Sequence, residues 1–121
     1  MENNDIVELL LNPDELKLIL EKYLKEQIGA NVSIEQRLGV KYESFYMTPT
    51  LEFIYNGIAL VDEEVNAALE EYAKSIGYKL DSFYYVGGVR RMGQFIDEDT
   101  PYFDGVKLNL IEKQKILGKR K

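Results

Sequence analysis

Histidine and cysteine are both absent from this chain of 121 residues. Without cysteine there are no disulfides, no thiolate nucleophiles and no zinc–thiolate sites. Without histidine the chain lacks the commonest general base and the commonest metal ligand. Any catalysis would have to use carboxylates, lysine, tyrosine or hydroxyl groups, so the composition favours a protein that is not an enzyme.

Long apolar segments are also absent. The most apolar segment, residues 6–11, is interrupted by Glu8 and is much shorter than the roughly 18 apolar residues of a membrane span. The N-terminus is acidic, whereas a secretory signal needs a basic start followed by an apolar run. We therefore expect a cytoplasmic protein without a membrane segment.

Catalytic motifs are missing as well. The chain contains no G-x-S-x-G, S-x-x-K or H-E-x-x-H pattern, the signatures of serine hydrolases, β-lactamase-like enzymes and zinc proteases. Two facing carboxylates could still support hydrolysis. Because the chain has 21 acidic residues, spacing in the sequence selects no pair, and a carboxylate-dependent enzyme stays a minor alternative.

The charges that are present are unevenly distributed, and the formal net charge is -6. Residues 107–121 contain six bases and one acid, a charge of +5, while residues 1–106 contain 20 acids and nine bases, a charge of -11. An acidic body repels nucleic-acid phosphates, so we expect no broad duplex-binding face. The basic C-terminal tail, from about residue 112, is interpreted as a solvated terminus, with contact to phosphate or an acidic neighbour as the alternative.

The first half of the chain contains a strong helix signal. Asn12 and Glu15 have the spacing of a capping box, and apolar residues then recur at helical spacing until Gly29, which is placed to end the helix. Residues 6–11 are interpreted as a short preceding helix, because Pro13 disfavours one continuous helix.

The remaining residues predict a second helix and several strands. The helix begins with Asp62 as its cap and ends at Gly77. Asn56-Gly57 is the best signal for a two-residue hairpin turn, Gly87-Gly88 is interpreted as another turn, and Gly39 as a bend. The expected strands are residues 32–38, 40–46, 51–55, 58–61, 80–86, 89–96 and 106–110, with an acidic loop at 97–104.

This order of elements predicts an α+β fold. Strands joined as hairpins give a mainly antiparallel sheet, and the two main helices should pack on one face of it as a second layer. The sequence shows no repeat, low-complexity segment or linker, so residues 1–121 are expected to form a single domain.

Tyrosine is abundant, with nine residues, whereas tryptophan is absent. A sheet with helices on one side leaves its other face open, and exposed tyrosine beside arginine is typical of protein-binding hot spots. Ordinary strand packing and binding of a nucleic acid or nucleotide are the alternatives for these aromatic residues. The predicted partner-binding residues are Tyr46, Tyr55, Tyr84, Tyr85, Arg90 and Arg91.

Acidic residues form two further candidate surfaces. Glu63, Glu64, Glu70 and Glu71 predict an acidic face on the second helix, which is either solvated or an imitation of a phosphate array. The loop from Asp97 to Asp104 gathers carboxylates that Ca²⁺ or Mg²⁺ could use, but its spacing is not that of an EF-hand. We therefore predict no metal and no cofactor.

The sequence thus favours a non-enzymatic interaction protein that binds, or binds and inhibits, a protein partner through a tyrosine-rich sheet face and the acidic helix. A homodimer through the open sheet face is a further possibility. The alternatives are a small-ligand or nucleotide-binding domain with a pocket between sheet and helices, and a nucleic-acid mimic. A small, acidic, tyrosine-rich and cysteine-free chain with a lysine-rich end is similar in general composition to phage and mobile-element accessory proteins, and no motif carries this resemblance.

Overall fold

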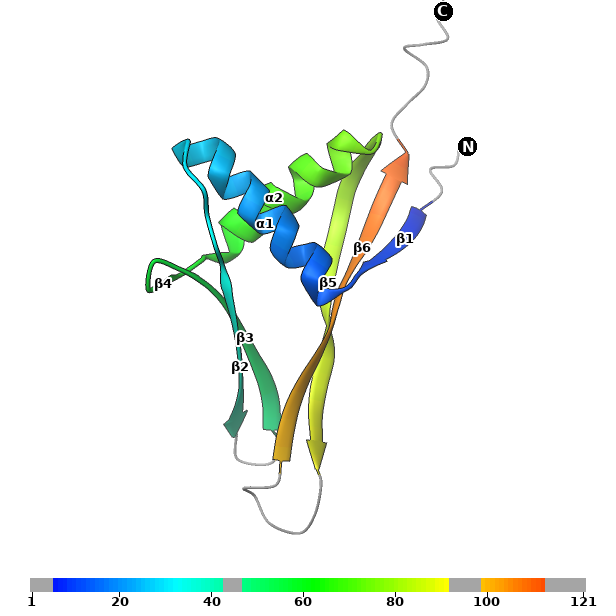
Figure 1. The fold of residues 1–121 in the computed structure, drawn as a ribbon. Helices are drawn as coiled ribbons and strands as arrows, with labels where there is room; N and C mark the ends of the chain where they lie inside the picture. The colour runs from blue at the N-terminus through cyan, green and yellow to red at the C-terminus, as the bar shows by residue number, and fades with distance from the viewer. Residues whose placement is uncertain (1–5, 43–46, 92–98, 113–121) are drawn as a thin grey trace, which may run out of the picture.

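The computed structural model describes residues 6–42, 47–91 and 99–112 (Figure 1). The α+β prediction is confirmed, since the described residues form two helices and two antiparallel sheets of three strands each. In chain order the elements are β1 (Ile6–Leu11), α1 (Pro13–Ile28), β2 (Glu35–Tyr42), β3 (Met47–Tyr55), β4 (Ile58–Ala59), α2 (Asp62–Ser75), β5 (Tyr78–Arg91) and β6 (Asp99–Glu112).

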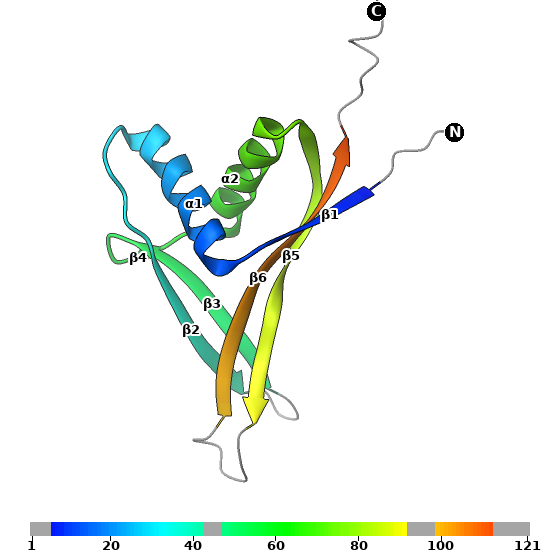
Figure 2. The same cartoon turned by 45° about the vertical axis from the view of Figure 1, so that its right-hand side comes forward.

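The strands divide into two sheets where the sequence predicts one. The first sheet has the order β1-β6-β5 and the second has the order β2-β3-β4. Both helices lie beside the upper part of the first sheet, and the β2–β3 ribbon runs alongside the β5–β6 ribbon below them (Figures 1 and 2). One face of the first sheet is therefore covered by helices at one end and by a second sheet at the other.

Alternation along β6 defines the two faces of the first sheet. Val106, Leu108 and Leu110 are buried, and we call the face that carries them the inner face. Lys107 and Asn109 alternate with them and lie on the opposite, outer face. The inner face joins one hydrophobic cluster that also contains Leu16, Leu20 and Leu24 of α1, and Val65, Ala68, Leu69 and Ala73 of α2.

Local signals set the ends of α1 as the sequence predicts. The Asn12 side chain accepts a hydrogen bond from the Glu15 backbone N–H, and the Glu15 carboxylate accepts one from the Asn12 N–H, both at 2.8 Å. Gly29 adopts a left-handed conformation with φ 72° and donates its N–H to the carbonyl of Lys25. The capping box and the terminal glycine are therefore confirmed.

The start of α2 differs by one residue from the prediction. Val61, not Asp62, precedes the first helical turn, and its backbone N–H donates to Glu64 Oε1 at 2.9 Å. Asp62 is the first helical residue, where a carboxylate still favours the positive end of the helix dipole. The helix ends at Ser75, shortly before Gly77, whose φ is 89°.

The helix predicted for residues 6–11 is wrong, because this segment is strand β1. It pairs antiparallel with β6 from Ile6 opposite Ile111 to Leu11 opposite Val106. A short apolar run has no preference strong enough to select a helix over a strand. The paired residues of β6 are 95 to 105 positions away in the chain, so only the tertiary structure can select the strand.

The turn predicted at Gly87-Gly88 and the bend at Gly39 are also wrong, because these glycines lie inside strands. β5 pairs with β6 through Gly87 and Gly88 as far as Arg91 opposite Asp99. Residues 99–104, predicted as loop, are therefore strand, and residues 92–98 lie outside the described part. A Cβ atom on Gly87 would collide with the carbonyl oxygen of Tyr102, and one on Gly39 would lie 2.8 Å from Thr50 Oγ1. These glycines permit close approach of neighbouring strands.

The hairpin predicted at Asn56-Gly57 is confirmed. Both residues have positive φ values, 57° and 81°, as a two-residue hairpin turn of this type requires. The turn joins β3 to β4, which is only two residues long. β2 begins at Glu35, three residues later than predicted. The residue before it, Ile34, donates its backbone N–H to the Glu21 carboxylate of α1 at 2.7 Å.

Candidate binding surface

The outer face of the first sheet carries three of the exposed apolar side chains. Ile6 is 56% exposed, Leu10 is 52% exposed and Tyr84 is 48% exposed. We call these three residues, with Glu8 and Lys107 between them, the outer-face patch. Strand register arranges this face in three rows, namely Leu10, Lys107 and Tyr84; Glu8, Asn109 and Ser82; and Ile6, Ile111 and Lys79.

Polar groups in the middle of this face bind one another. Lys107 Nζ lies 3.5 Å from Glu8 Oε1 and 6.0 Å from the centroid of the Tyr84 ring. The Glu8 carboxylate, and secondarily Tyr84, raise the pKa of Lys107 above its ordinary value. Asn109 Nδ2 donates a hydrogen bond to Ser82 Oγ at 3.0 Å. The charges on the patch therefore offset each other, and the apolar side chains around them face solvent.

A second aromatic–cationic pair lies further along β5 and β6. The Arg90 guanidinium lies 4.8 Å from the centroid of the Tyr102 ring, within the range of a cation–π interaction. Tyr102 pairs directly with Gly88, and its ring covers the position that a Gly88 side chain would occupy. Tyr102 was not among the predicted site residues, because its pairing with Gly88 depends on a register that the sequence does not reveal.

Tyr84 and Tyr85, predicted to act together, lie on opposite faces of the sheet. The Tyr85 ring packs on the inner face against Phe83, Phe103 and Phe53, with centroid distances of 5.8, 6.0 and 6.2 Å. Although 38% of the residue is exposed, burial of the phenol, with the nearby carboxylate of Asp62, raises the pKa of Tyr85 to about 12. Tyr85 therefore belongs to the packing between the two sheets.

The other predicted tyrosines and arginines are not brought to the outer-face patch. Tyr55 is half-buried and packs against the hydrophobic cluster. Tyr46 lies outside the described residues, as does the side chain of Arg91, the last residue of β5. Of the six predicted partner-binding residues, the structure thus shows Tyr84 and Arg90 exposed on the outer face.

The acidic face of α2 is separate from the outer-face patch. Glu63, Glu70 and Glu71 are exposed, whereas Glu64 is half-buried and accepts the hydrogen bond from Val61. Because α2 packs against β5 on the inner side of the sheet, its acidic face and the outer-face patch point away from each other. A partner that touches both would have to wrap around the edge of the sheet.

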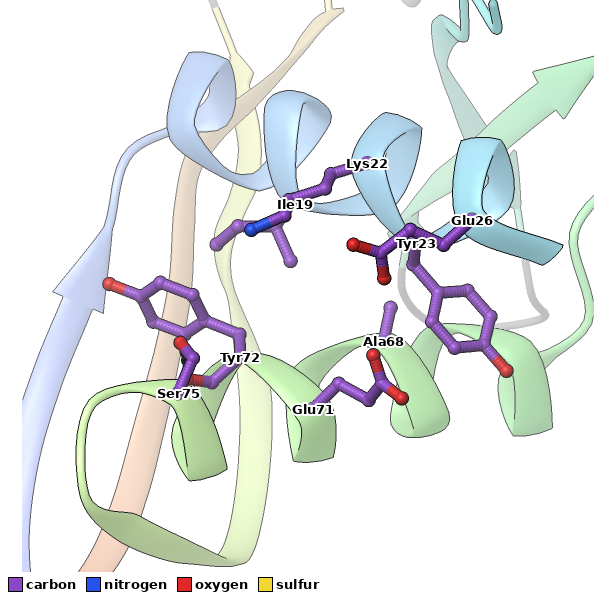
Figure 3. A pocket seen from close by; sticks show the side chains of 8 residues that line it. All are labelled: Ile19, Lys22, Tyr23, Glu26, Ala68, Glu71, Tyr72 and Ser75. Carbon is purple, nitrogen blue, oxygen red and sulfur yellow. Dashed lines mark hydrogen bonds between the residues drawn. The ribbon is translucent and has the colours of Figure 1, made fainter. Parts of the chain in front are cut away.

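A groove of about 210 Å³ lies between α1 and α2 (Figure 3). Glu26 of α1 and Glu71 of α2 line it, and the rings of Tyr23 and Tyr72 stand on either side. Ala68 forms part of the floor. The predicted pocket lay between sheet and helices, whereas this groove opens between the two helices and is lined by Ile19, Lys22, Tyr23, Glu26, Ala68, Glu71, Tyr72 and Ser75.

Within residues 6–42, 47–91 and 99–112, no group of three or more histidine, cysteine or acidic side chains is arranged to hold a metal ion. Asp104 is an exposed residue of β6, not of a loop. Asp97 and Glu98, the other residues that suggested a cation site, lie outside these ranges.

Comparison of the chain with protein families, with curated proteins and with solved structures finds no significant match. In the part of the chain that the structure describes, neither helix is long and apolar enough to cross a membrane. The surfaces of the molecule are therefore the features that can indicate its function.

Proposed function

We propose that this chain is a non-enzymatic interaction protein that binds a protein partner through the outer-face patch. The observation that carries the proposal is an uncovered sheet face on which Ile6, Leu10 and Tyr84 remain about half exposed. Half-exposed apolar side chains that share one sheet face are typical of interaction surfaces. Tyrosine supplies a large contact area at a low cost in side-chain entropy.

The chemistry of the patch suits a protein more than a nucleic acid. Its lysine is already paired with Glu8, so it offers little free positive charge for phosphate binding. Arg90, stacked on Tyr102, extends the surface with a residue that is enriched in binding hot spots. The expected contact therefore combines the exposed side chains of Ile6, Leu10 and Tyr84 with a central set of polar groups that already bind one another.

The acidic face of α2 acts in this proposal by steering. Glu63, Glu70 and Glu71 are exposed and lie away from the patch, so their contribution is to attract a basic partner and raise the association rate. This long-range attraction is screened by salt, whereas the apolar contact at Tyr84 is not. Inhibition would follow if the bound surface of the partner overlaps its own active site.

The test compares capture from host lysate by the full chain and by matched variants, with quantitative mass spectrometry as the readout. Tyr84→Ala should reduce capture of the specific partner at least about tenfold, as expected for a hot-spot residue. Leu18→Ala is the control, because Leu18 is 64% exposed on α1 and far from the patch. Equal capture by wild type and Tyr84→Ala would refute the proposal.

A small ligand in the groove between the helices is the second candidate function. Its support is that Glu26 and Glu71 face the groove and form no ion pair with another described residue. A thermal-shift screen with nucleotides, amines and divalent metals tests it, because a ligand at 100 times its Kd stabilises the folded state by about 2.7 kcal/mol. A shift that Glu71→Gln removes would establish this function, and no shift across the panel would dismiss it.

A further inference from the structure

Strand β1 forms an unprotected edge of the first sheet. It is the outermost strand in the order β1-β6-β5, and Figures 1 and 2 show it at the outside of the fold. Its pairing with β6 is regular over all six residues, without a bulge. Ile6, Val7 and Leu10 are each at least 40% exposed. A regular apolar edge of this kind can pair with another strand.

The other strand edges among the described residues carry features that discourage such pairing. β5 contains two register irregularities and the Gly87-Gly88 pair, and it contacts β3 and α2. β2 carries Arg37, Gly39 and Lys41, and β4 has only two residues. Bulges, basic residues and short length are the usual means of protecting sheet edges. β1, with the sequence Ile-Val-Glu-Leu-Leu-Leu, has none of them.

We propose that β1 pairs with β1 of a second copy of this chain, antiparallel and about a twofold axis, to form a continuous sheet of six strands. Charge permits a second copy at this edge, although the net charge of the chain is -6, because the one charge on β1, Glu8, is offset by Lys107 at 3.5 Å. β1 is also complementary to itself, since five of its six residues are apolar and can face one another in an antiparallel pair. Twofold dimers are the commonest closed form of self-association.

The length of β1 and the position of Glu8 together select the register. A twofold axis at Leu9 or at Glu8 pairs five residues of β1 with its copy, whereas an axis at Val7 or Leu10 pairs only three. A twofold axis at Leu9 places Leu9 opposite its own copy, Val7 opposite Leu11, and Glu8 opposite Leu10. An axis at Glu8 would instead place two carboxylates directly opposite each other, which is destabilising. In the Leu9-centred register the outer faces of both copies are continuous, so the dimer presents two outer-face patches on one side. This inference extends the proposed function but does not depend on it.

The first experiment measures the mass of the pure full-length protein against concentration by analytical ultracentrifugation. Wild type should shift reversibly to twice the chain mass. Leu10→Glu should weaken association at least about tenfold, because it sets two carboxylates opposite each other at each end of the pairing. Leu18→Glu, an equally large change at an exposed site on α1, should associate as wild type does. A single-chain mass at every concentration, or equal association of the two variants, would overturn the proposal.

The second experiment uses the absence of cysteine from the chain. Residues directly opposite on antiparallel strands have Cβ atoms about 4.5–5.5 Å apart, close to the span of a disulfide. A mixture of Glu8→Cys and Leu10→Cys proteins should form cross-linked dimers faster than either variant alone. A mixture of Glu8→Cys and Leu18→Cys proteins is the control. Equal rates in both mixtures would exclude the register, even if Leu10→Glu fails to fold.

The two proposals fail independently. Tyr84 lies on β5, away from the pairing edge, so Tyr84→Ala should leave the dimer intact while it reduces partner capture. If the wild type is monomeric and Tyr84→Ala still reduces partner capture, the pairing of β1 is overturned and the proposed function stands. If the wild type is a dimer and Tyr84→Ala does not change capture, the proposed function is overturned and the pairing of β1 stands.

Discussion

The two faces of the β1-β6-β5 sheet differ sharply in how far their side chains are buried. Leu108 on the inner face is fully buried, while Leu10, one strand away on the outer face, is 52% exposed. Adjacent residues of β5 show the same contrast, since Tyr85 packs between the sheets and Tyr84 faces solvent. The inner face contributes to the hydrophobic core and the outer face is exposed to solvent, so the two tyrosines have different environments despite identical chemistry.

The largest expected effect comes from deleting side-chain volume on each face. Leu108→Ala should lower the free energy of unfolding by about 2–5 kcal/mol, because it removes buried apolar atoms and leaves a cavity. Leu10→Ala, the matched change on the outer face, should cost less than about 1 kcal/mol. Urea denaturation of both variants measures the difference. Similar losses would mean that the outer face is also covered in solution.

A smaller effect is expected at Gly105, where the backbone of β6 lies close to the end of β1. Its φ is 135°, and a Cβ atom there would collide with the carbonyl oxygen of Leu11. Gly105→Ala should therefore destabilise the protein by roughly 1–3 kcal/mol, the cost of backbone strain. Gly57→Ala is the control, since Gly57 also has a positive φ but has open space around it. The control should lose less stability in the same denaturation assay.

The smallest effect is a loss of stability at alkaline pH that depends on Tyr85 of the inner face. Burial raises the pKa of Tyr85 to about 12, above its ordinary value of 10.0. Between these values the unfolded chain binds fewer protons than the folded chain, so the free energy of unfolding falls as pH rises, and below this window Tyr85 contributes no pH dependence. Tyr85→Phe should flatten the fall relative to wild type, because it removes the titrating hydroxyl. Denaturant midpoints at several pH values between about 9 and 11.5 test this, and equal slopes in wild type and Tyr85→Phe would contradict it.

The structural elements that the sequence predicted correctly are those with local causes. The capping box of Asn12 and Glu15, the left-handed Gly29 and the Asn56-Gly57 turn each depend on residues within a few positions. Their conformations are favoured by steric and hydrogen-bonding preferences of the residues themselves. The same applies to the α+β class, because helical and alternating patterns persist over whole elements.

The errors fall where strands pair over long distances. Residues 6–11 became β1 because β6 supplies a partner, and Gly87-Gly88 became strand because the neighbouring chain approaches closely there. Glycine occurs both in turns and where neighbouring strands approach closely, so its presence in the sequence does not distinguish the two. The role of Tyr102, which covers Gly88 and stacks with Arg90, follows from that same unpredicted register.

The sequence by itself determined the composition and the local elements: an acidic chain without histidine or cysteine, two helices, the capping box of α1 and a hairpin turn. The tertiary structure alone decided which tyrosine packs between the sheets and which lies on the outer face, and that β1 lies at an edge. The physical reason is that side chains alternate with a period of two residues along a strand, so each bulge or shift in register reverses which side chains face the core. Register depends on contacts between distant segments, and these exist only once the chain has folded.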